Sequence, residues 1–249
     1  MRTILSTIAL FSLCGLFAQE YVPTHGRELP RGELLAYPSA EAATASDGGD
    51  NRYFTRLTEW SLDGNVFSTD FTVPFAWANR QVLFHLGWAS GDYELRVNGR
   101  PAACNADGNT PAEFNLTKLT KEGRNSLEIV VAQPSPTAPL ESWKEAPRPA
   151  IGGAWVMSQP TLHIRDVITR TRLAEDGSAT AEVAVVLKSD ALNPRTSRIH
   201  YELLDPTGER AAAGHKDFTL DMRREDTLRF LTRIPLNMLW CAELPTQYT

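Results

Sequence analysis

A two-residue period of apolar side chains runs through most of this sequence, and no other feature restricts the fold as strongly. In four segments of the first half, apolar residues alternate with polar or small ones; these segments are 67–73, 82–86, 93–97 and 127–131. Such alternation is typical of strands that bury one face and expose the other. The dipeptide Asn98-Gly99 follows the third segment and favours a type I′ hairpin turn, which needs positive φ at both central residues. Only residues 41–46 suggest a short helix, so the sequence predicts an all-β protein.

The same period continues in the second half, where aromatic residues are sparser and turns are more regular. Six strand patterns can be identified there, at 165–173, 179–188, 197–204, 209–214, 216–221 and 227–234. Short strands at this spacing predict an immunoglobulin-like sandwich, a fold of about seven strands. We therefore expect a sandwich that is incomplete at its C-terminus and that unfolds more readily than the first half.

The N-terminus has the pattern of a secretory signal peptide. Arg2 supplies a positive charge, residues 4–17 are largely apolar, and Ala18 precedes the polar Gln19. We therefore expect an exported protein, periplasmic or extracellular. The predicted layout is a signal peptide at 1–18, an extended linker at 19–50, one β-sandwich at 51–162 and an immunoglobulin-like sandwich at 163–249.

Charge and motif content exclude several classes of function. The chain has 25 basic and 30 acidic residues, a net charge of −5, and no run of basic residues, so we expect no nucleic-acid partner. Beyond the signal peptide, no apolar stretch reaches the roughly 20 residues that cross a bilayer. The sequence contains no P-loop, no HExxH and no GxGxxG. Cys104, Cys241 and the five histidines show no metal-ligand spacing, so we expect neither a metal nor a cofactor.

Few residues are candidates for a binding site. Asp107 and Asn109, in a turn-like segment, could contact calcium or a sugar hydroxyl, although capping of the turn by Asp107 is the simpler interpretation. Trp143 and Trp155 flank a proline-rich irregular segment and could offer aromatic faces to a sugar. The other tryptophans considered are expected to fill the sandwich cores, namely Trp60, Trp77, Trp88 and Trp240.

Several of these segments together resemble glycoside hydrolase family 2, the β-galactosidase family. The stretch ELRVNGRPAACNADGNTPAEFNLTKLTKEGRNSLEIVV is similar to the sugar-binding domain of that family, and FSTDFTVPFAWANRQVLFHLG is similar to an earlier part of the same domain. The stretches PTLHIRDVITRTRL and LNMLWCAELPTQYT resemble the entry and a later segment of its immunoglobulin-like domain. The resemblance implies a galactose-binding-like jelly-roll sandwich over 51–162, followed by the immunoglobulin-like sandwich. It extends from about residue 50 to Thr249.

The resemblance also indicates which functional groups lie outside this chain. Members of the family are retaining glycosidases whose two catalytic glutamates lie on a barrel that follows the immunoglobulin-like domain, so no catalytic residue is expected here. Retention needs two carboxyl groups about 5–5.5 Å apart. Where some members place a sugar-contacting aspartate, this sequence has Ser135 or Pro136. If the chain binds a carbohydrate, we expect the binding face to include Asp107, Asn109 and Trp143.

Three interpretations are compatible with these observations. The first is the non-catalytic N-terminal part of an exported β-galactosidase-type enzyme, whose partners would be a catalytic barrel and a β-galactoside-class carbohydrate. The second is a free-standing carbohydrate-binding or adhesion module. The third is an inert truncated gene product. The first accounts for the order of the motifs and is the interpretation we adopt.

Overall fold

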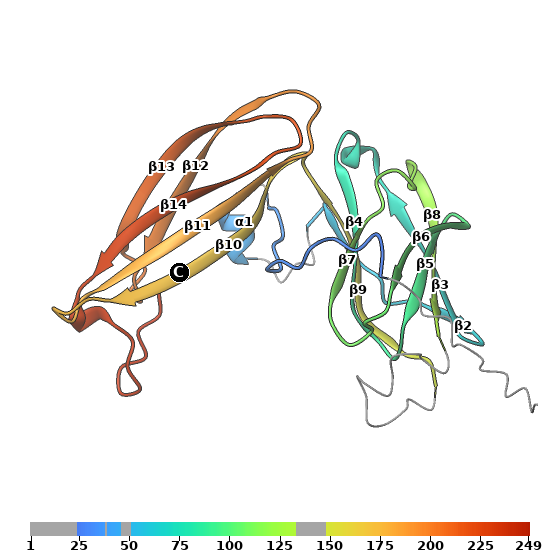
Figure 1. Cartoon of the computed structure of the whole chain (residues 1–249), viewed down its shortest axis with the longest axis horizontal. Helices are drawn as coiled ribbons and strands as arrows, with labels where there is room; N and C mark the ends of the chain where they lie inside the picture. The colour runs from blue at the N-terminus through green and yellow to red at the C-terminus, as the bar shows by residue number, and fades with distance from the viewer. Residues whose placement is uncertain (1–23, 38, 46–50, 133–147) are drawn as a thin grey trace, which may run out of the picture.

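The protein folds into two β-sandwiches that lie side by side (Figure 1). The structure is a computed structural model, and it describes residues 24–37, 39–45, 51–132 and 148–249. The predicted signal peptide and Trp143 lie outside the described residues. The all-β prediction is confirmed, with a jelly-roll-like sandwich first and an immunoglobulin-like sandwich second.

The first sandwich consists of two antiparallel sheets. The five-stranded sheet has the order β2 (Ser61–Asp63), β3 (Val66–Val73), β8 (Gly123–Val131), β5 (Tyr93–Val97), β6 (Arg100–Asn105). The four-stranded sheet has the order β1 (Phe54–Arg56), β9 (Ile151–Gln159), β4 (Gln81–Ala89), β7 (Ala112–Asn115). A 3₁₀ turn, η1 (Phe75–Trp77), connects β3 to β4. All four strands predicted in this half are confirmed.

The core of the first sandwich is formed by the apolar residues that the two-residue period selects. Phe84 and Leu86 of β4 are completely buried against Leu95 of β5 and Ile129 of β8. Each such side chain contributes about 1.5–3 kcal/mol when it is buried. The turn after β5 also has the expected geometry, since Asn98 and the following glycine have φ of 52° and 73°.

The second sandwich packs a three-stranded sheet against a two-stranded one. The larger sheet has the order β10 (Leu162–Leu173), β11 (Ala179–Ser189), β14 (Glu225–Ile234), and the smaller pairs β12 (Arg195–Leu204) with β13 (Arg210–Leu220). A short 3₁₀ turn, η2 (Leu236–Met238), follows β14.

One strand prediction in the second sandwich is wrong. The segments 209–214 and 216–221 were expected as two strands but form the single strand β13. Gly214 does not break the strand, because it makes room for the Tyr201 ring of β12: a Cβ on Gly214 would lie 2.7 Å from Tyr201 Cε1. The sheets described for this half therefore contain five long strands.

The second core is much smaller than the first. Its buried members are Val185, Leu187, Leu220 and Phe230, with partly buried side chains such as Tyr201 around them. The tryptophan predictions hold only in part. Trp77 is 2% exposed and Trp60 packs against the first core, but Trp88 and Trp240 are 45% and 64% exposed and fill no core.

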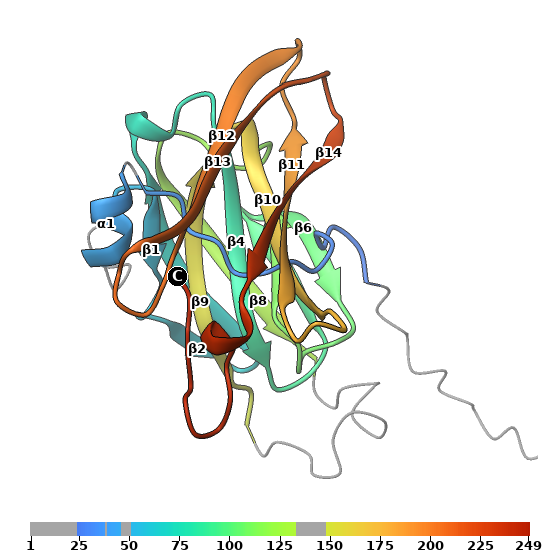
Figure 2. The same ribbon diagram turned by 90° about the vertical axis from the view of Figure 1, so that its left-hand side faces the viewer.

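The short helix expected at 41–46 is present as α1 (Ala40–Ala45). It lies beside the sandwiches and covers neither sheet (Figure 2). None of its residues is buried. Ser39 caps its first turn, with its side-chain oxygen accepting a hydrogen bond from the Ala42 amide at 3.2 Å.

Candidate functional site

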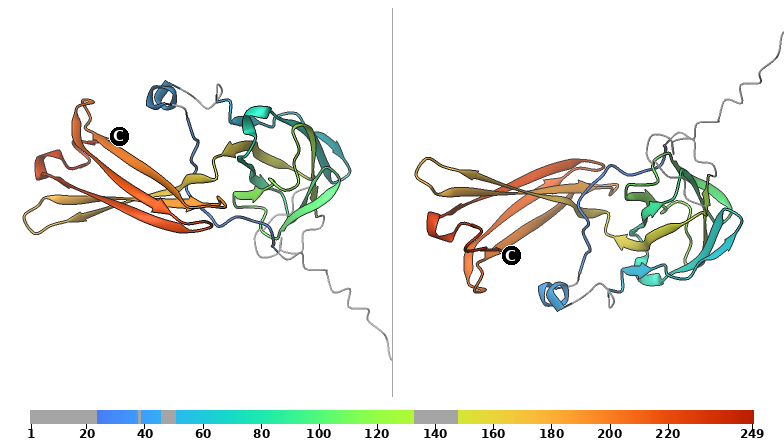
Figure 3. Two further views of the ribbon diagram at one scale, coloured as in Figure 1. Left: turned by 90° about the horizontal axis from the view of Figure 1, so that it is seen from above. Right: turned by 90° about the horizontal axis from the view of Figure 1, so that it is seen from below.

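The segment of residues 24–37, which we call the N-terminal strap, connects the two sandwiches. It runs from the edge of the first sandwich towards the second (Figure 3). His25 pairs with Cys104 of β6 through backbone bonds of 2.9 and 3.2 Å, and the Glu28 amide donates to the Glu113 carbonyl of β7 at 2.8 Å. Further along, the Gly32 amide donates to Asp166 Oδ1 of β10 at 3.1 Å. The strap is therefore hydrogen-bonded to both sandwiches.

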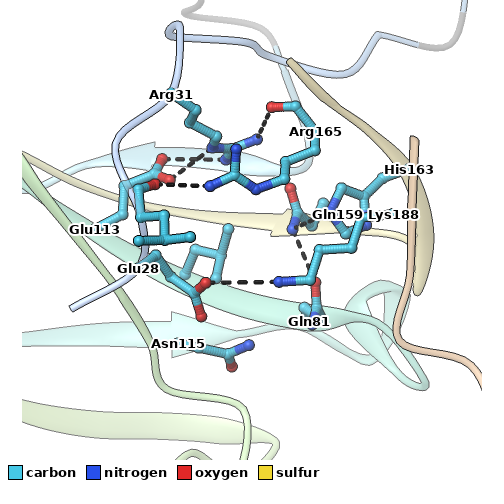
Figure 4. A pocket seen from close by; sticks show the side chains of 11 residues that line it. Glu28, Arg31, Gln81, Glu113, Asn115, Gln159, His163, Arg165 and Lys188 are labelled. Carbon is cyan, nitrogen blue, oxygen red and sulfur yellow. Dashed lines mark hydrogen bonds and ion pairs between the residues drawn. The ribbon is translucent and has the colours of Figure 1, made fainter. Parts of the chain in front are cut away.

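The strongest contact of the strap is the pair Arg31–Glu113. The guanidinium donates two parallel hydrogen bonds to the carboxylate, Nε–Oε2 at 2.7 Å and Nη2–Oε1 at 3.1 Å. The side chains are only 7% and 15% exposed. Arg31 Nη1 also donates to the Arg165 carbonyl of β10 at 3.3 Å. The Arg31 side chain thus bonds both to Glu113 of the first sandwich and to the Arg165 carbonyl of the second sandwich (Figure 4).

Residues of the second sandwich also contact the strap and the first sandwich. Arg165 Nη2 donates to the Leu29 carbonyl at 3.0 Å, and Lys188 Nζ of β11 lies 3.7 Å from a Glu28 carboxylate oxygen. Gln81 Nε2 of β4 donates to Asp190 Oδ2 at 2.9 Å. These groups form a polar seam between the two sandwiches, and Figure 4 shows Glu28, Arg165, Lys188 and Gln81 within it.

Two histidines lie in or beside this seam, and both are held neutral. Burial lowers the pKa of His163 to about 4, against the opposing effects of the Pro160 carbonyl and Asp190. His163 Nδ1 lies 3.0 Å from the Pro160 carbonyl oxygen, and His163 Nε2 lies 3.2 Å from Gln159 Nε2. Both distances fit a neutral ring that donates a hydrogen bond to the carbonyl and accepts one from the amide.

His85 of β4 stacks face to face on Trp155 of β9, with ring centroids 3.7 Å apart. Burial lowers its pKa, although Glu113, 4.0 Å away, acts to raise it. His85 and Glu113 therefore do not form an ion pair at neutral pH. The buried Trp155 indole nitrogen has no hydrogen-bond partner within the described residues.

The seam does not have the properties of a catalytic or sugar-binding pocket. At the centre of the seam, the cavity lined by Glu28, Arg31, Glu113 and Lys188 measures about 20 Å³, which is room for about one water molecule, whereas ligand pockets measure about 300–1,000 Å³. Its carboxylates are already neutralised by cations of the chain, Glu113 by Arg31 and Glu28 by Lys188. In the part of the chain that the structure describes, no group of three or more His, Cys, Asp or Glu could hold a metal ion. The arrangement joins two domains.

The structure does not test the predicted carbohydrate-contacting residues together, because Trp143 lies outside the described residues. Asp107 caps its own turn: Oδ1 accepts from the backbone amides of Asn109 and Thr110, each at 3.2 Å. Arg27 of the strap lies 3.6 Å from the same carboxylate. Asn109 is exposed at the tip of this turn. Contact of these residues with a sugar stays a prediction.

Sequence analysis missed a groove beside the five-stranded sheet. It measures about 580 Å³ and lies next to β3 and β8. Its lining combines the indole of Trp60 with the carboxylates of Asp70 and Glu128 and the hydroxyls of several serines and threonines. The signal available in the sequence was the set of polar residues that alternate with the apolar ones on these two strands, which is rich in serine, threonine and acidic residues.

Comparisons with known proteins show which proteins have a similar sequence and fold. No protein-family model matches the chain. It is 29% identical over 203 residues to β-galactosidases of Yersinia pestis (strain Angola) and Yersinia pseudotuberculosis (serotype O:1b), an alignment that covers 73% of this chain. The aligned part is 19% and 18% of those proteins, so the chain spans about a fifth of the curated relatives it matches.

Solved structures show the same relationship at the level of fold. A glycosyl hydrolase family 2 member from Bacteroides cellulosilyticus matches with a TM-score of 0.62 and 17% identity, over 74% of this chain and 25% of that one. A β-glucuronidase of Bacteroides uniformis matches with a TM-score of 0.62 and 20% identity, over 74% of this chain and 23% of that one. A putative β-galactosidase from Bacteroides fragilis also gives 0.62, at 15% identity, over 74% and 29%.

These matches define the class of protein. The chain is a two-domain, all-β module similar to the N-terminal domains of glycoside hydrolase family 2 proteins. The resemblance to β-galactosidases predicted from the sequence motifs is thereby confirmed. No helix in the described ranges is long and apolar enough to cross a membrane.

Proposed function

We propose that this chain is the non-catalytic N-terminal portion of a β-galactosidase-type glycoside hydrolase and that it holds two β-domains in a fixed arrangement beside the catalytic domain. The observation that carries this proposal is the seam, in which a 14-residue strap connects both sandwiches through the nearly buried Arg31–Glu113 pair. Two domains can fix the position of a neighbouring catalytic domain only if their own relative arrangement is rigid. The similarity to about a fifth of the Yersinia enzymes supports the same proposal.

The proposal predicts that the chain alone does not hydrolyse glycosides. Without two carboxyl groups about 5–5.5 Å apart across the glycosidic bond, the barrier to cleavage is not lowered. The test is release of nitrophenol from p-nitrophenyl β-galactoside and β-glucuronide by the purified chain, compared with a buffer blank. Turnover that disappears when an acidic residue of this chain is replaced would refute the proposal.

A second candidate function, carbohydrate binding by this chain itself, is favoured by the groove beside β3 and β8. Its volume lies within the range of small-molecule sites, and its lining offers one aromatic face with hydroxyl and carboxylate groups. Titration with galactose and lactose, followed by tryptophan fluorescence, tests this function. Binding lost in Trp60→Ala would locate it in the groove, whereas loss in Asp107→Ala or Trp143→Ala would locate it at the positions predicted from the sequence.

We further propose that the protein is exported, with Met1–Ala18 as its signal peptide. The support is the order of Arg2, an apolar run and a small residue before Gln19. N-terminal sequencing of the protein recovered from the host's extracellular or periplasmic fraction tests this proposal. A mature chain that begins at Gln19 is the expected result, and an intact Met1 would contradict it.

A further inference from the structure

The β12–β13 hairpin carries a row of polar cross-strand pairs on the face that points away from the second core. Its register places three pairs opposite one another: Thr196–Thr219, Arg198–Asp217 and His200–His215. The residues between them, such as Ile199 and Tyr201, pack against the core. The outward row is therefore fixed in register by the inward residues, since a shift of one position would exchange the two faces.

The two histidines of this row face each other closely. Their ring centroids lie 5.5 Å apart with an angle of 35° between the planes, and both residues are exposed. Neither ring has a hydrogen-bond partner among the residues that the structure describes. We propose that His200 and His215 together bind one divalent late transition-metal ion, of the class of Zn²⁺, Ni²⁺ or Cu²⁺.

The separation of the rings suits a shared metal ion. In a tetrahedral site each imidazole nitrogen lies about 2.0–2.1 Å from the metal, which sets the two ring centroids about 5 Å apart. The observed centroid separation of 5.5 Å is close to this value, and both side chains are exposed. Imidazole nitrogen suits zinc, copper and nickel, whereas magnesium and calcium prefer oxygen ligands.

The neighbouring carboxylates do not supply a third ligand. Asp217 is bonded to Arg198, and Glu202 lies 2.9 Å from Arg210, so water would complete the coordination. With two protein ligands, the site would bind more weakly than a four-ligand structural zinc site.

The backbone beneath the pair is held in place from the core side. The Tyr201 ring lies over Gly214, and this pair directly follows the His200–His215 pair in the register. Its ring also packs on Phe230 of β14 at 4.3 Å, and its hydroxyl lies 3.3 Å from Thr232 Oγ1. The two imidazoles therefore project from a braced hairpin, which reduces the ordering needed when they bind a metal.

The test uses the full chain and Cu²⁺ or Zn²⁺ as the probe. Isothermal titration at pH 7.5 is expected to show one ion bound per chain, with the affinity lowered about tenfold or more in His200→Gln and in His215→Gln. His25→Gln, which removes another exposed histidine, is the matched control and should leave this affinity unchanged.

A spectroscopic measurement distinguishes this site from metal bound elsewhere. Electron paramagnetic resonance of the Cu²⁺ complex should show two equatorial nitrogens in the natural protein and one in each variant. Circular dichroism verifies that the variants fold, which their exposed positions lead us to expect. The inference is overturned by the absence of saturable one-to-one binding, or by binding and a nitrogen pattern that both substitutions leave unchanged.

Discussion

Replacing Arg31 by methionine should destabilise the protein far more than an ordinary surface substitution. Methionine retains an apolar stem of similar length but leaves the Glu113 carboxylate, 15% exposed, without its cation. Removing one partner of a buried ion pair costs about 3–5 kcal/mol, and the slight exposure of this pair places the expected loss near 3 kcal/mol. His85 cannot compensate, because burial lowers its pKa and leaves it neutral.

Urea unfolding at pH 7.5, followed by circular dichroism, measures this loss. Arg198→Met is the matched control, since its pair with Asp217 is 50% and 63% exposed and should contribute nothing measurable. The double variant Arg31→Met/Glu113→Gln leaves no stranded charge and should recover more than half of the loss. If Arg31→Met unfolds at the same urea concentration as the control, the strap does not depend on this pair and our reasoning is wrong.

Three further predictions concern other parts of the structure. Because burial lowers the pKa of His163 to about 4, the unfolded chain takes up this proton first as the pH falls. Stability should therefore decrease between about pH 6.5 and pH 4 by up to about 3 kcal/mol, and urea unfolding of His163→Gln over this range should show a smaller decrease. Gly108→Ala should lower the melting temperature markedly, since the new Cβ would lie 2.6 Å from the Ala89 carbonyl oxygen; an unchanged value would refute that packing. Phe230→Ala should cost about 3–5 kcal/mol and accelerate hydrogen exchange in β10–β14 only, whereas acceleration throughout would show that the sandwiches unfold together.

The strands of both sandwiches could be predicted because their signal is local. Alternation over 67–73 or 127–131 needs no knowledge of the rest of the chain, and the Asn98-Gly99 turn is determined by two adjacent residues. The error at β13 has a cause outside the segment. The prediction divides this strand at His215, next to Gly214, and only the position of Tyr201 on the neighbouring strand explains why a glycine stands within the continuous strand.

The seam could not be predicted, because its partners are remote in the sequence. Arg31 bonds to Glu113, 82 positions away, and to Arg165, 134 positions away. Nothing in the linker composition distinguishes this arginine from a solvated one. The pairing of His200 with His215 could not be predicted either. Their spacing of 15 residues matches no metal motif, and only the hairpin register brings them together.

The position of the strap also has a consequence for the order of events during synthesis. Residues 24–37 leave the ribosome before either sandwich, yet Gly32 bonds to Asp166 and Arg31 to the Arg165 carbonyl, on a strand that is completed more than a hundred residues later. The strap can pair with β6 and β7 as soon as the first sandwich forms, but its contacts with the second sandwich must wait until β10 has emerged. Contacts of such long sequence separation form slowly. Docking of β10 on the N-terminal strap is thus a late step of folding, and it is the step that joins the two sandwiches.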